Sequence, residues 1–423
     1  MFGRVLRIGC AALAVAVLSA GGARAQLPVD VPDVPATADR LGDVVRSRVD
    51  RTRERTQETL RDVRRDTLDS LLRQNRDTLE RGPDRSVIVR SQITVLADDR
   101  SGLGPLLGQG FGLVRERPLG SLGLSLFVLS APPGLSTRRA LDLARQLDPA
   151  GLYDFNHIYT RSGGPALHSW AALQGYATAR QTRIGLVDTG VDARHPALAG
   201  FRLEREAFHG GAYQPADHGT AVASLLASVS GTLVSADIYG GGPTGGSADA
   251  LIAALGWMSD SGVAVINVSL VGPPNRLLEH VVGTLAARGH IVVAAVGNDG
   301  ASARPLYPAA YEGVIGVTGV SERGRVLPEA GRGPHVDFAA PGAFDSAAGT
   351  DGAHIRVRGT SYAAPVVASL LASWVDRPDP ARAQSAIETL AASAEDAGRR
   401  GRDDTYGYGI VGRSTLRTAS SRE

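Results

Sequence analysis

The feature that most constrains the fold is an alternation of short apolar segments with helix-forming segments, which begins near residue 161. The apolar segments are rich in Val, Ile and Ala and are mostly followed by glycine, as buried parallel strands are. The predicted strands are 183–188, 234–239, 263–269, 290–296 and 313–320, and the predicted helices are 219–228, 248–259 and 275–288. The pattern predicts an α/β fold in which helices flank a parallel β-sheet, with ligands at the carboxyl ends of its strands.

A different pattern precedes this region. The predicted strands are 87–96, 111–117, 122–130 and 152–159, and a short helix is expected within 101–109. Ser136 is the expected N-cap of a second helix that carries apolar side chains on one face. The order β-α-β-β-α-β is that of a small ferredoxin-like α+β domain. We therefore predict one domain over residues 86–160 and a larger one over residues 161–423.

Residues 1–25 have the organisation of a secretory signal peptide: two arginines, an apolar run and a closing Ala-Arg-Ala. A membrane-spanning helix is the alternative, but the apolar run is shorter than the roughly 20 residues that a bilayer requires. Cys10 is the only cysteine, so its removal leaves no disulfide or thiol chemistry. The sequence predicts an exported protein, periplasmic or secreted, with no membrane span in the mature chain.

The segment 26–85 begins as a proline-spaced linker and becomes dense in Arg, Asp and Glu. Sparse leucines within it indicate a charged helical or disordered segment. Because acidic residues are interleaved with the arginines, and the net charge of the whole chain is only +2, no nucleic-acid partner is predicted.

The first candidate for chemistry is Asp188, in the sequence Asp-Thr-Gly directly after an apolar strand. A carboxylate at the end of a buried strand needs a polar partner. Aspartic proteases use the same tripeptide, but their chemistry needs two such carboxylates that share a proton. The chain has no second Asp-Thr-Gly, so an aspartic protease that relied on this tripeptide would require a dimer.

Two further candidates stand where helices are expected to begin. His218 precedes a helix of small residues, and a helix N-terminus disfavours added positive charge, which suits a neutral general base. Ser361 precedes an apolar helix, where its own backbone N–H is left free to bind an oxyanion. Taken singly, each residue is equally compatible with an ordinary helix cap.

Together these segments resemble the signature segments of the subtilisin-like serine proteases (subtilases, peptidase S8), in the order Asp, His, Ser. A fourth segment, which ends at Asn298, resembles the strand that carries the oxyanion-hole asparagine of that family. The resemblance covers about residues 161–412. It implies that Asp188 orients the imidazole, His218 is the base, Ser361 is the nucleophile and Asn298 is an oxyanion donor.

The resemblance also indicates where substrate binds. Ser269, Leu270, Val271 and Gly272 resemble the strand on which substrates of the family add as a further β-strand. Relatives usually have glycine in place of Val271, so its side chain is expected to narrow the primary specificity pocket. The glycine-rich residues 240–246 are expected at the opposite edge; a phosphate cradle, the alternative for this stretch, lacks the lysine that should follow.

Residues 86–160 resemble in pattern the inhibitory propeptide domain that precedes many such proteases, and their last residues are expected in the active-site cleft. We predict self-cleavage between about Asn156 and Gly163. The bonds after Tyr159 and Thr160 compete there, and a narrowed pocket favours the bond after Thr160. An accessory domain that stays attached is the alternative.

The predicted function is that of an exported serine endopeptidase, which hydrolyses peptide bonds through an acyl-enzyme intermediate and processes itself. The alternative is a catalytically inactive peptide-binding member of the same family. The predicted partners are polypeptide substrates and the chain's own N-terminal domain. No cofactor or metal site is predicted, and the sequence leaves calcium dependence open.

Overall fold

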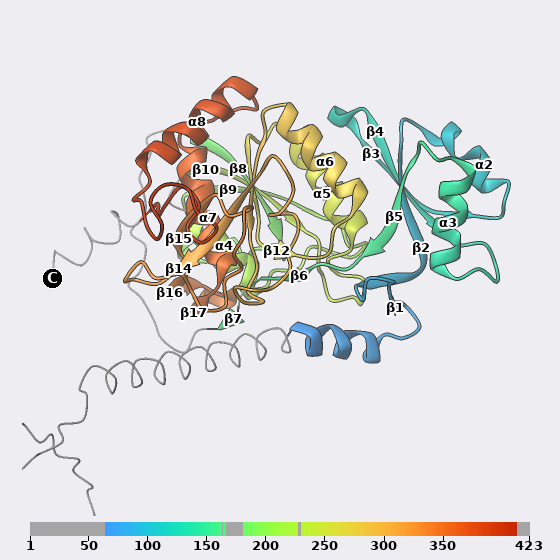
Figure 1. The fold of residues 1–423 in the computed structure, drawn as a ribbon, viewed down its shortest axis with the longest axis horizontal. Helices are drawn as coiled ribbons and strands as arrows, with labels where there is room; N and C mark the ends of the chain where they lie inside the picture. Colours follow the sequence, from blue (N-terminus) through green and yellow to red (C-terminus); the bar gives the residue numbers. More distant parts are fainter. Residues whose placement is uncertain (1–63, 163, 166–180, 227–229, 413–423) are drawn as a thin grey trace, which may run out of the picture. The chain divides into compact units, whose positions relative to one another are not determined.

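The computed structural model describes residues 64–162, 164–165, 181–226 and 230–412 (Figure 1). The predicted signal peptide and most of the charged segment 26–85 lie outside the described residues. Among the described residues, no helix is both long enough and apolar enough to cross a bilayer.

Seven described strands form a parallel sheet in the order β15-β14-β13-β11-β8-β10-β9. The strands are β8 (Gln181–Asp188), β9 (Phe201–Ala207), β10 (Ser230–Asp237), β11 (Val265–Val268), β13 (Ile291–Ala295), β14 (Val314–Val320) and β15 (Phe338–Pro341). The sheet confirms the predicted α/β class. The central strands consist almost entirely of buried residues, which is why the sequence identified them.

Two strands of this sheet were not predicted from the sequence, and both lie at its edges. The strand β9 has the sequence Phe-Arg-Leu-Glu-Arg-Glu-Ala and is only partly buried. Charged residues are common on edge strands because they discourage pairing with other chains. The strand β15 is only four residues long and ends at a proline. Neither segment therefore shows the long apolar run that marks a central strand.

Helices cover both faces of the parallel sheet (Figure 1). The buried side chains of α4 (Asp217–Leu226), α7 (Thr360–Ala372) and α8 (Pro380–Ser393) share one core with one face. Those of α5 (Ala248–Asp260) and α6 (Arg276–Ala287) share the core on the other face. Almost every residue of α7 is buried, as expected for a helix that is apolar all round.

The N-terminal region forms a separate antiparallel sheet with the spatial order β5-β2-β4-β3. Its strands are β2 (Val87–Ala97), β3 (Gly112–Leu119), β4 (Leu124–Ser130) and β5 (Leu152–His157). Its helical elements are η1 (Arg100–Leu103), α2 (Gly104–Leu107), η2 (Gly120–Leu122) and α3 (Thr137–Leu147). The Ser136 side chain accepts from the Arg139 N–H at the start of α3. The predicted α+β unit is confirmed.

Two elements precede this unit along the chain. Residues 64–74 are helical, and β1 (Leu79–Arg81) pairs with the first residues of β2. The sequence predicted no strand at β1, which is only three residues long.

The N-terminal sheet packs on the α5 and α6 side of the parallel sheet. Four of its leucines share the core that α5 and α6 line: Leu96, Leu119, Leu122 and Leu126. The carboxylate of Asp154 accepts from the N–H of Arg276 at 2.8 Å, at the first residue of α6. The amide of Asn156 accepts from the Asp249 N–H at 3.1 Å, in the first turn of α5. The strand β5 thus supplies acceptors to two helix N-termini.

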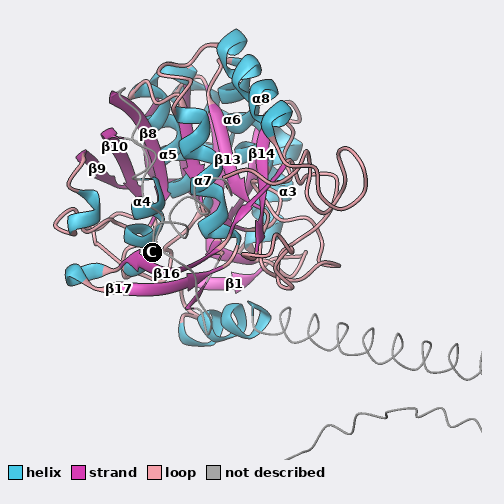
Figure 2. Ribbon diagram, turned by 90° about the vertical axis from the view of Figure 1, so that its left-hand side faces the viewer, coloured by secondary structure: helices cyan, strands magenta, loops and turns pink. Residues whose placement is uncertain are grey.

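The remaining elements are short. β12 (Leu270–Val271) pairs with β6 (Thr160–Arg161), and β16 (Ala343–Ala348), β17 (His354–Arg358) and β7 (Gly164–Pro165) form a three-stranded sheet. The pair β16–β17 lies below the parallel sheet in Figure 2. Two 3-10 turns complete the described elements, η3 (Pro196–Leu198) and η4 (Thr350–Gly352).

Candidate active site

Asp188 and His218 form a buried hydrogen-bonded pair at the carboxyl end of the parallel sheet. Asp188 is the last residue of β8, and His218 is the second residue of α4. Their Oδ1 and Nδ1 atoms lie 2.7 Å apart, with exposures of 0% and 6%. The pair fixes the orientation of the imidazole ring and leaves Nε2 available on its other side.

The local backbone holds this pair in place. The Thr189 N–H donates to Asp188 Oδ1 at 2.7 Å, and the Thr189 hydroxyl accepts from the Gly219 N–H at 2.8 Å. A Cβ on Gly219 would lie only 2.2 Å from the Thr189 carbonyl oxygen. Glycine therefore allows α4 to begin directly against the end of β8.

Ser361 is the second residue of α7 and is fully buried. Its backbone N–H donates to the carbonyl oxygen of Ser162 at 3.1 Å. Its hydroxyl donates to the Ser269 carbonyl at 3.1 Å, whereas Nε2 of His218 has no hydrogen-bond partner among the described residues. The rings of His218 and Tyr362 lie 5.5 Å apart, so the histidine is adjacent to the start of α7.

Asn298 follows β13 and connects the start of α7 to Ser162. Its Oδ1 accepts from the Thr360 N–H at 3.1 Å, and its Nδ2 donates to the Ser162 hydroxyl at 3.0 Å. The side chain of Asn298 and the backbone N–H of Ser361 thus both bind Ser162, one through its hydroxyl and the other through its carbonyl.

The segment around Ser162 is held as a strand between two parts of the larger region. In the antiparallel pair of β6 with β12, Arg161 lies opposite Leu270 and Thr160 lies opposite Val271. The Ser162 N–H donates to the Ser269 carbonyl at 3.4 Å, which continues this ladder by one residue.

On the opposite side, the Tyr159 N–H donates to the Gly246 carbonyl at 2.8 Å, and Ile158 forms an isolated bridge with Ser247. Residues 240–246 were expected at the edge of the site opposite residues 269–272. Of these, Gly246 forms the backbone hydrogen bond to the segment. The predicted residue Gly272 does not pair with the segment. Its backbone bonds in both directions with Tyr307, at 2.8 and 3.1 Å.

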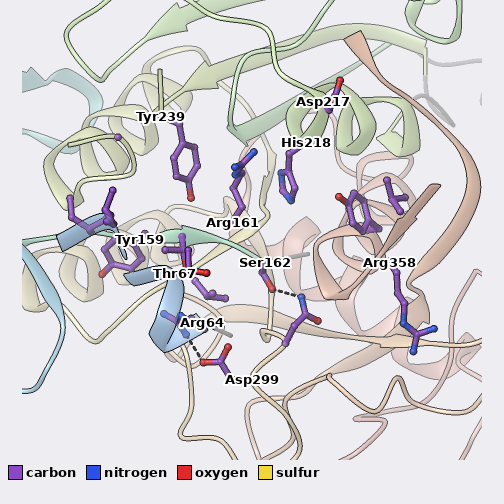
Figure 3. A pocket seen from close by; sticks show the side chains of 18 of the residues that line it. Arg64, Thr67, Tyr159, Arg161, Ser162, Asp217, His218, Tyr239, Asp299 and Arg358 are labelled. Atoms are coloured by element: carbon purple, nitrogen blue, oxygen red, sulfur yellow. Dashed lines mark hydrogen bonds and ion pairs between the residues drawn. The ribbon is translucent and has the colours of Figure 1, made fainter. Parts of the chain in front are cut away.

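A cleft of about 1030 Å³ is lined by residues 158–162 together with His218, Val271 and Asn298 (Figure 3). Sequence reasoning did not identify Arg64, Tyr239, Asp299 or Leu306, which lie in this cleft or beside it. Burial raises the pKa of Tyr239 well above its usual range, so the phenol stays neutral. None of these four residues belongs to a motif that could have identified it. Among the described residues, no group of three or more His, Cys, Asp or Glu side chains is arranged to hold a metal ion.

A parallel α/β sheet with an Asp–His pair at its carboxyl edge, and a buried serine at a helix N-terminus beside it, is an arrangement found in serine hydrolases. The sequence profile of the subtilase family, Peptidase_S8, matches residues 179–409. The chain belongs to the subtilase family, a family of serine peptidases.

Individual relatives are consistent with this membership. The chain is 33% identical over 224 residues to a thermophilic serine proteinase of Bacillus sp. (strain AK1), a match that covers 48% of this chain and 54% of the relative. It is 31% identical over 228 residues to subtilisin E of Bacillus subtilis (strain 168), which covers 49% and 58%. The match spans little more than half of each relative's length.

Among solved structures, fervidolysin from Fervidobacterium pennivorans, a keratinolytic enzyme related to subtilisin, has a similar fold, with a TM-score of 0.63 and 20% sequence identity. The similarity covers 78% of this chain and 61% of fervidolysin. Because this exceeds the extent of the sequence matches, the fold is shared over more of the chain than the sequence comparisons reach.

Proposed function

We propose that the protein is a serine endopeptidase and that Asp188, His218 and Ser361 are its catalytic triad. The observation that carries the proposal is the position of Ser162. Its carbonyl oxygen accepts from the Ser361 N–H at 3.1 Å, while the preceding residues pair with β12 as an added strand. A polypeptide segment is therefore bound with one carbonyl beside the proposed nucleophile, as a substrate would be.

The proposed reaction begins when the Ser361 hydroxyl transfers its proton to Nε2 of His218 and Oγ attacks the substrate carbonyl carbon. For this step the hydroxyl must exchange its present bond to the Ser269 carbonyl for one to Nε2. His218 then gives the proton to the leaving amine, and water hydrolyses the acyl-enzyme by the same route. Asp188 holds the imidazole tautomer and stabilises the imidazolium.

The Ser361 N–H and the Asn298 side-chain amide are the proposed donors to the oxyanion. The first already contacts a substrate-like carbonyl oxygen, and the second lies beside it on the Ser162 hydroxyl. Donors that are fixed before the reaction stabilise the developing charge without reorganisation.

We further propose that the chain cuts itself at the Ser162–Gly163 bond, and that the N-terminal α+β unit is an inhibitory propeptide. The hydrogen-bond register supports this bond, which lies two residues beyond the one that the sequence favoured. The proposal also keeps the predicted division into a propeptide-like domain over residues 86–160 and a peptidase domain over residues 161–423. It includes export through residues 1–25, to the periplasm or the medium; one relative, of Bacillus subtilis (strain 168), is named minor extracellular protease Epr.

The test compares the wild-type protein with Ser361→Ala, expressed from the full sequence. The wild type should react with a fluorophosphonate probe, hydrolyse peptides and yield a mature chain that begins at Gly163. The Ser361→Ala variant should do none of these and should retain its N-terminal region. A wild-type protein that binds peptides but neither labels nor cleaves would instead be the inactive peptide-binding alternative.

A further inference from the structure

The residue that would precede the scissile bond has a small, enclosed side chain. Ser162 is 3% exposed. Its hydroxyl accepts from Asn298 Nδ2 at 3.0 Å and shares a second hydrogen bond of 3.0 Å with the hydroxyl of Thr360. The side chain of Ser162 is therefore buried and held by two hydrogen bonds.

Two branched side chains converge on the backbone that precedes Asn298. A Cβ built on Gly297 would lie 2.5 Å from Cδ1 of Leu306 and 3.5 Å from Cγ1 of Val271. Gly297 has φ +99°, so its own conformation also excludes most side chains there. Val271 and Leu306 therefore fill the space over Gly297 from two different segments.

The two segments that carry Val271 and Leu306 are joined by backbone hydrogen bonds. Gly272, directly after Val271, donates to the Tyr307 carbonyl at 2.8 Å and accepts from the Tyr307 N–H at 3.1 Å. Tyr307 directly follows Leu306. Because these two backbones are paired in both directions, the segments that carry Val271 and Leu306 cannot move apart without breaking hydrogen bonds.

We propose that Val271 and Leu306 together restrict the residue before the scissile bond to Gly, Ala or Ser. This inference rests on the proposed function. A larger side chain would have to displace packed, branched side chains, and such a pocket discriminates by about 10- to 200-fold per methylene. Ser162 in the chain itself satisfies the restriction.

Leu306 also lines a second hollow, of about 400 Å³, that is bordered by Asp299, Ser302, Ala303 and Arg304. Asp299 lines both this hollow and the cleft. Shortening Leu306 should therefore open the pocket toward existing space, so the enlarged pocket should accept an aromatic side chain.

The test uses peptides with the sequence of residues 156–165, in which position 162 is Ser, Ala, Val or Phe. They are incubated with self-processed wild-type protein and with Val271→Ala, Leu306→Ala and the double variant. Mass spectrometry identifies the bond that is cut, and fluorophosphonate titration gives the concentration of active enzyme. Val282→Ala, on α6 and 1% exposed, is the matched control for the loss of a buried valine.

For wild type and the control variant, kcat/KM should be at least about 100-fold higher with Ala than with Phe before the cut bond. The double variant should cleave the Phe peptide at least about 10-fold faster than wild type does. Wild-type enzyme that cuts after Phe or Tyr159 as readily as after Ala would overturn the inference. If no variant reacts with the probe or cuts any peptide, the proposed function fails as well.

A second inference comes from the helical residues 64–74, which lie over the same cleft (Figure 3). Three of their leucines pack against the N-terminal sheet and Ile158: Leu68, Leu71 and Leu72. Arg64, Thr67 and Leu71 line the same cleft as residues 158–162. The bound segment is thus enclosed by helix 64–74 as well as by β12.

The helix is also joined to the proposed active site by an ion pair. Nη1 of Arg64 lies 2.8 Å from Oδ2 of Asp299, the residue after Asn298, and the two side chains are 17% and 19% exposed. A hydrogen bond to a mostly buried charged group contributes more than an exposed pair does.

We infer that helix 64–74 is a second inhibitory contact, which retains the cut N-terminal region in the cleft through Arg64 and Asp299. It also rests on the proposed function. The full-length variants Arg64→Gln, Asp299→Asn and their combination are compared with Arg73→Gln, a change at an exposed position of the same helix. The measured quantity is the delay between self-cleavage and the appearance of peptide hydrolysis, with activity normalised to the fully matured enzyme.

Arg64→Gln should shorten the delay by about 3- to 10-fold, and adding Asp299→Asn should shorten it little further, because both changes break one interaction. Arg73→Gln should behave like wild type. A delay in Arg64→Gln equal to that in Arg73→Gln would contradict the inference. Absence of self-cleavage in every variant, wild type included, would instead contradict the proposed function and this inference together.

Discussion

Replacing Asn156 with alanine tests how the N-terminal sheet is held on the larger region. Asn156 accepts from the Asp249 N–H at 3.1 Å and donates to the Asp249 carboxylate at 3.0 Å. Both residues are 1% exposed, so water screens neither bond. A neutral hydrogen bond contributes about 0.5–1.5 kcal/mol and one to a charged group about 1.5–3 kcal/mol.

The Asp249 carboxylate keeps two other partners, the Ser247 hydroxyl and Arg115. The expected loss is therefore near the low end of the sum, about 2–3 kcal/mol. At 1.4 kcal/mol for each factor of ten, the population of molecules whose N-terminal sheet is detached from the larger region should rise by roughly 30- to 150-fold.

The assay is amide hydrogen exchange on the full chain, with Ser361→Ala included to prevent self-cleavage. The reporters are the N–H groups of Arg276 and Tyr159, whose acceptors, Asp154 and Gly246, lie across the interface. Their exchange should accelerate by the factor given above.

Gln92→Ala provides the matched control for this variant. Gln92 accepts from Asn156 Nδ2 at 3.3 Å within the N-terminal sheet, and its side chain has no hydrogen bond to the larger region among the described residues, so exchange should change less than about threefold. Equal rates in the two variants would show that the contact with Asp249 does not hold the sheet in place.

Three further predictions follow from single side chains. Asn298→Ala should lower kcat by about 10²–10³-fold with little change in KM, the loss measured for an oxyanion-hole asparagine of subtilisin; steady-state kinetics with a loss of only a few-fold would remove Asn298 from the oxyanion site. Asp188→Asn should lower kcat by up to about 10⁴-fold, because the imidazole would lose the carboxylate that selects its tautomer; unchanged turnover in a correctly folded variant would exclude the proposed triad. Burial lowers the pKa of His157, whose Nδ1 bonds to Asn275 at 3.1 Å. When the N-terminal sheet detaches from the larger region, this imidazole becomes exposed and takes up a proton below about pH 6.5. The attachment of the sheet should therefore weaken as pH falls below about 6.5. Exchange of the interface amides at pH 7.5 and pH 5 measures this, and His157→Gln should abolish the difference between the two pH values.

The sequence determined the class of fold and the residues that were candidates for chemistry. Buried parallel strands are apolar throughout, so β8, β11 and β13 could be recognised from composition alone. The same reasoning placed Asp188 at the end of a strand and His218 at the start of a helix. These features are local: each depends on a few consecutive residues and on the periodicity of the element that contains them.

Tertiary structure decided how these elements meet. The sequence favoured the bond after Thr160, but the pairing of β6 with β12 brings the carbonyl of Ser162 to Ser361. Strand register depends on both partners, and a shift of one residue exchanges which side chains face the pocket. The sequence of residues 156–163 alone therefore does not determine this register.

Contacts between distant residues gave no signal in the sequence. Leu306 meets Gly297 across a loop, and Arg64 meets Asp299 although 235 positions separate them along the chain. A single arginine or leucine is compatible with many different contacts, so its partner is known only once the chain is folded. Propensity and periodicity act over a few residues, whereas the shape of the cleft depends on packing between elements that are distant in the sequence.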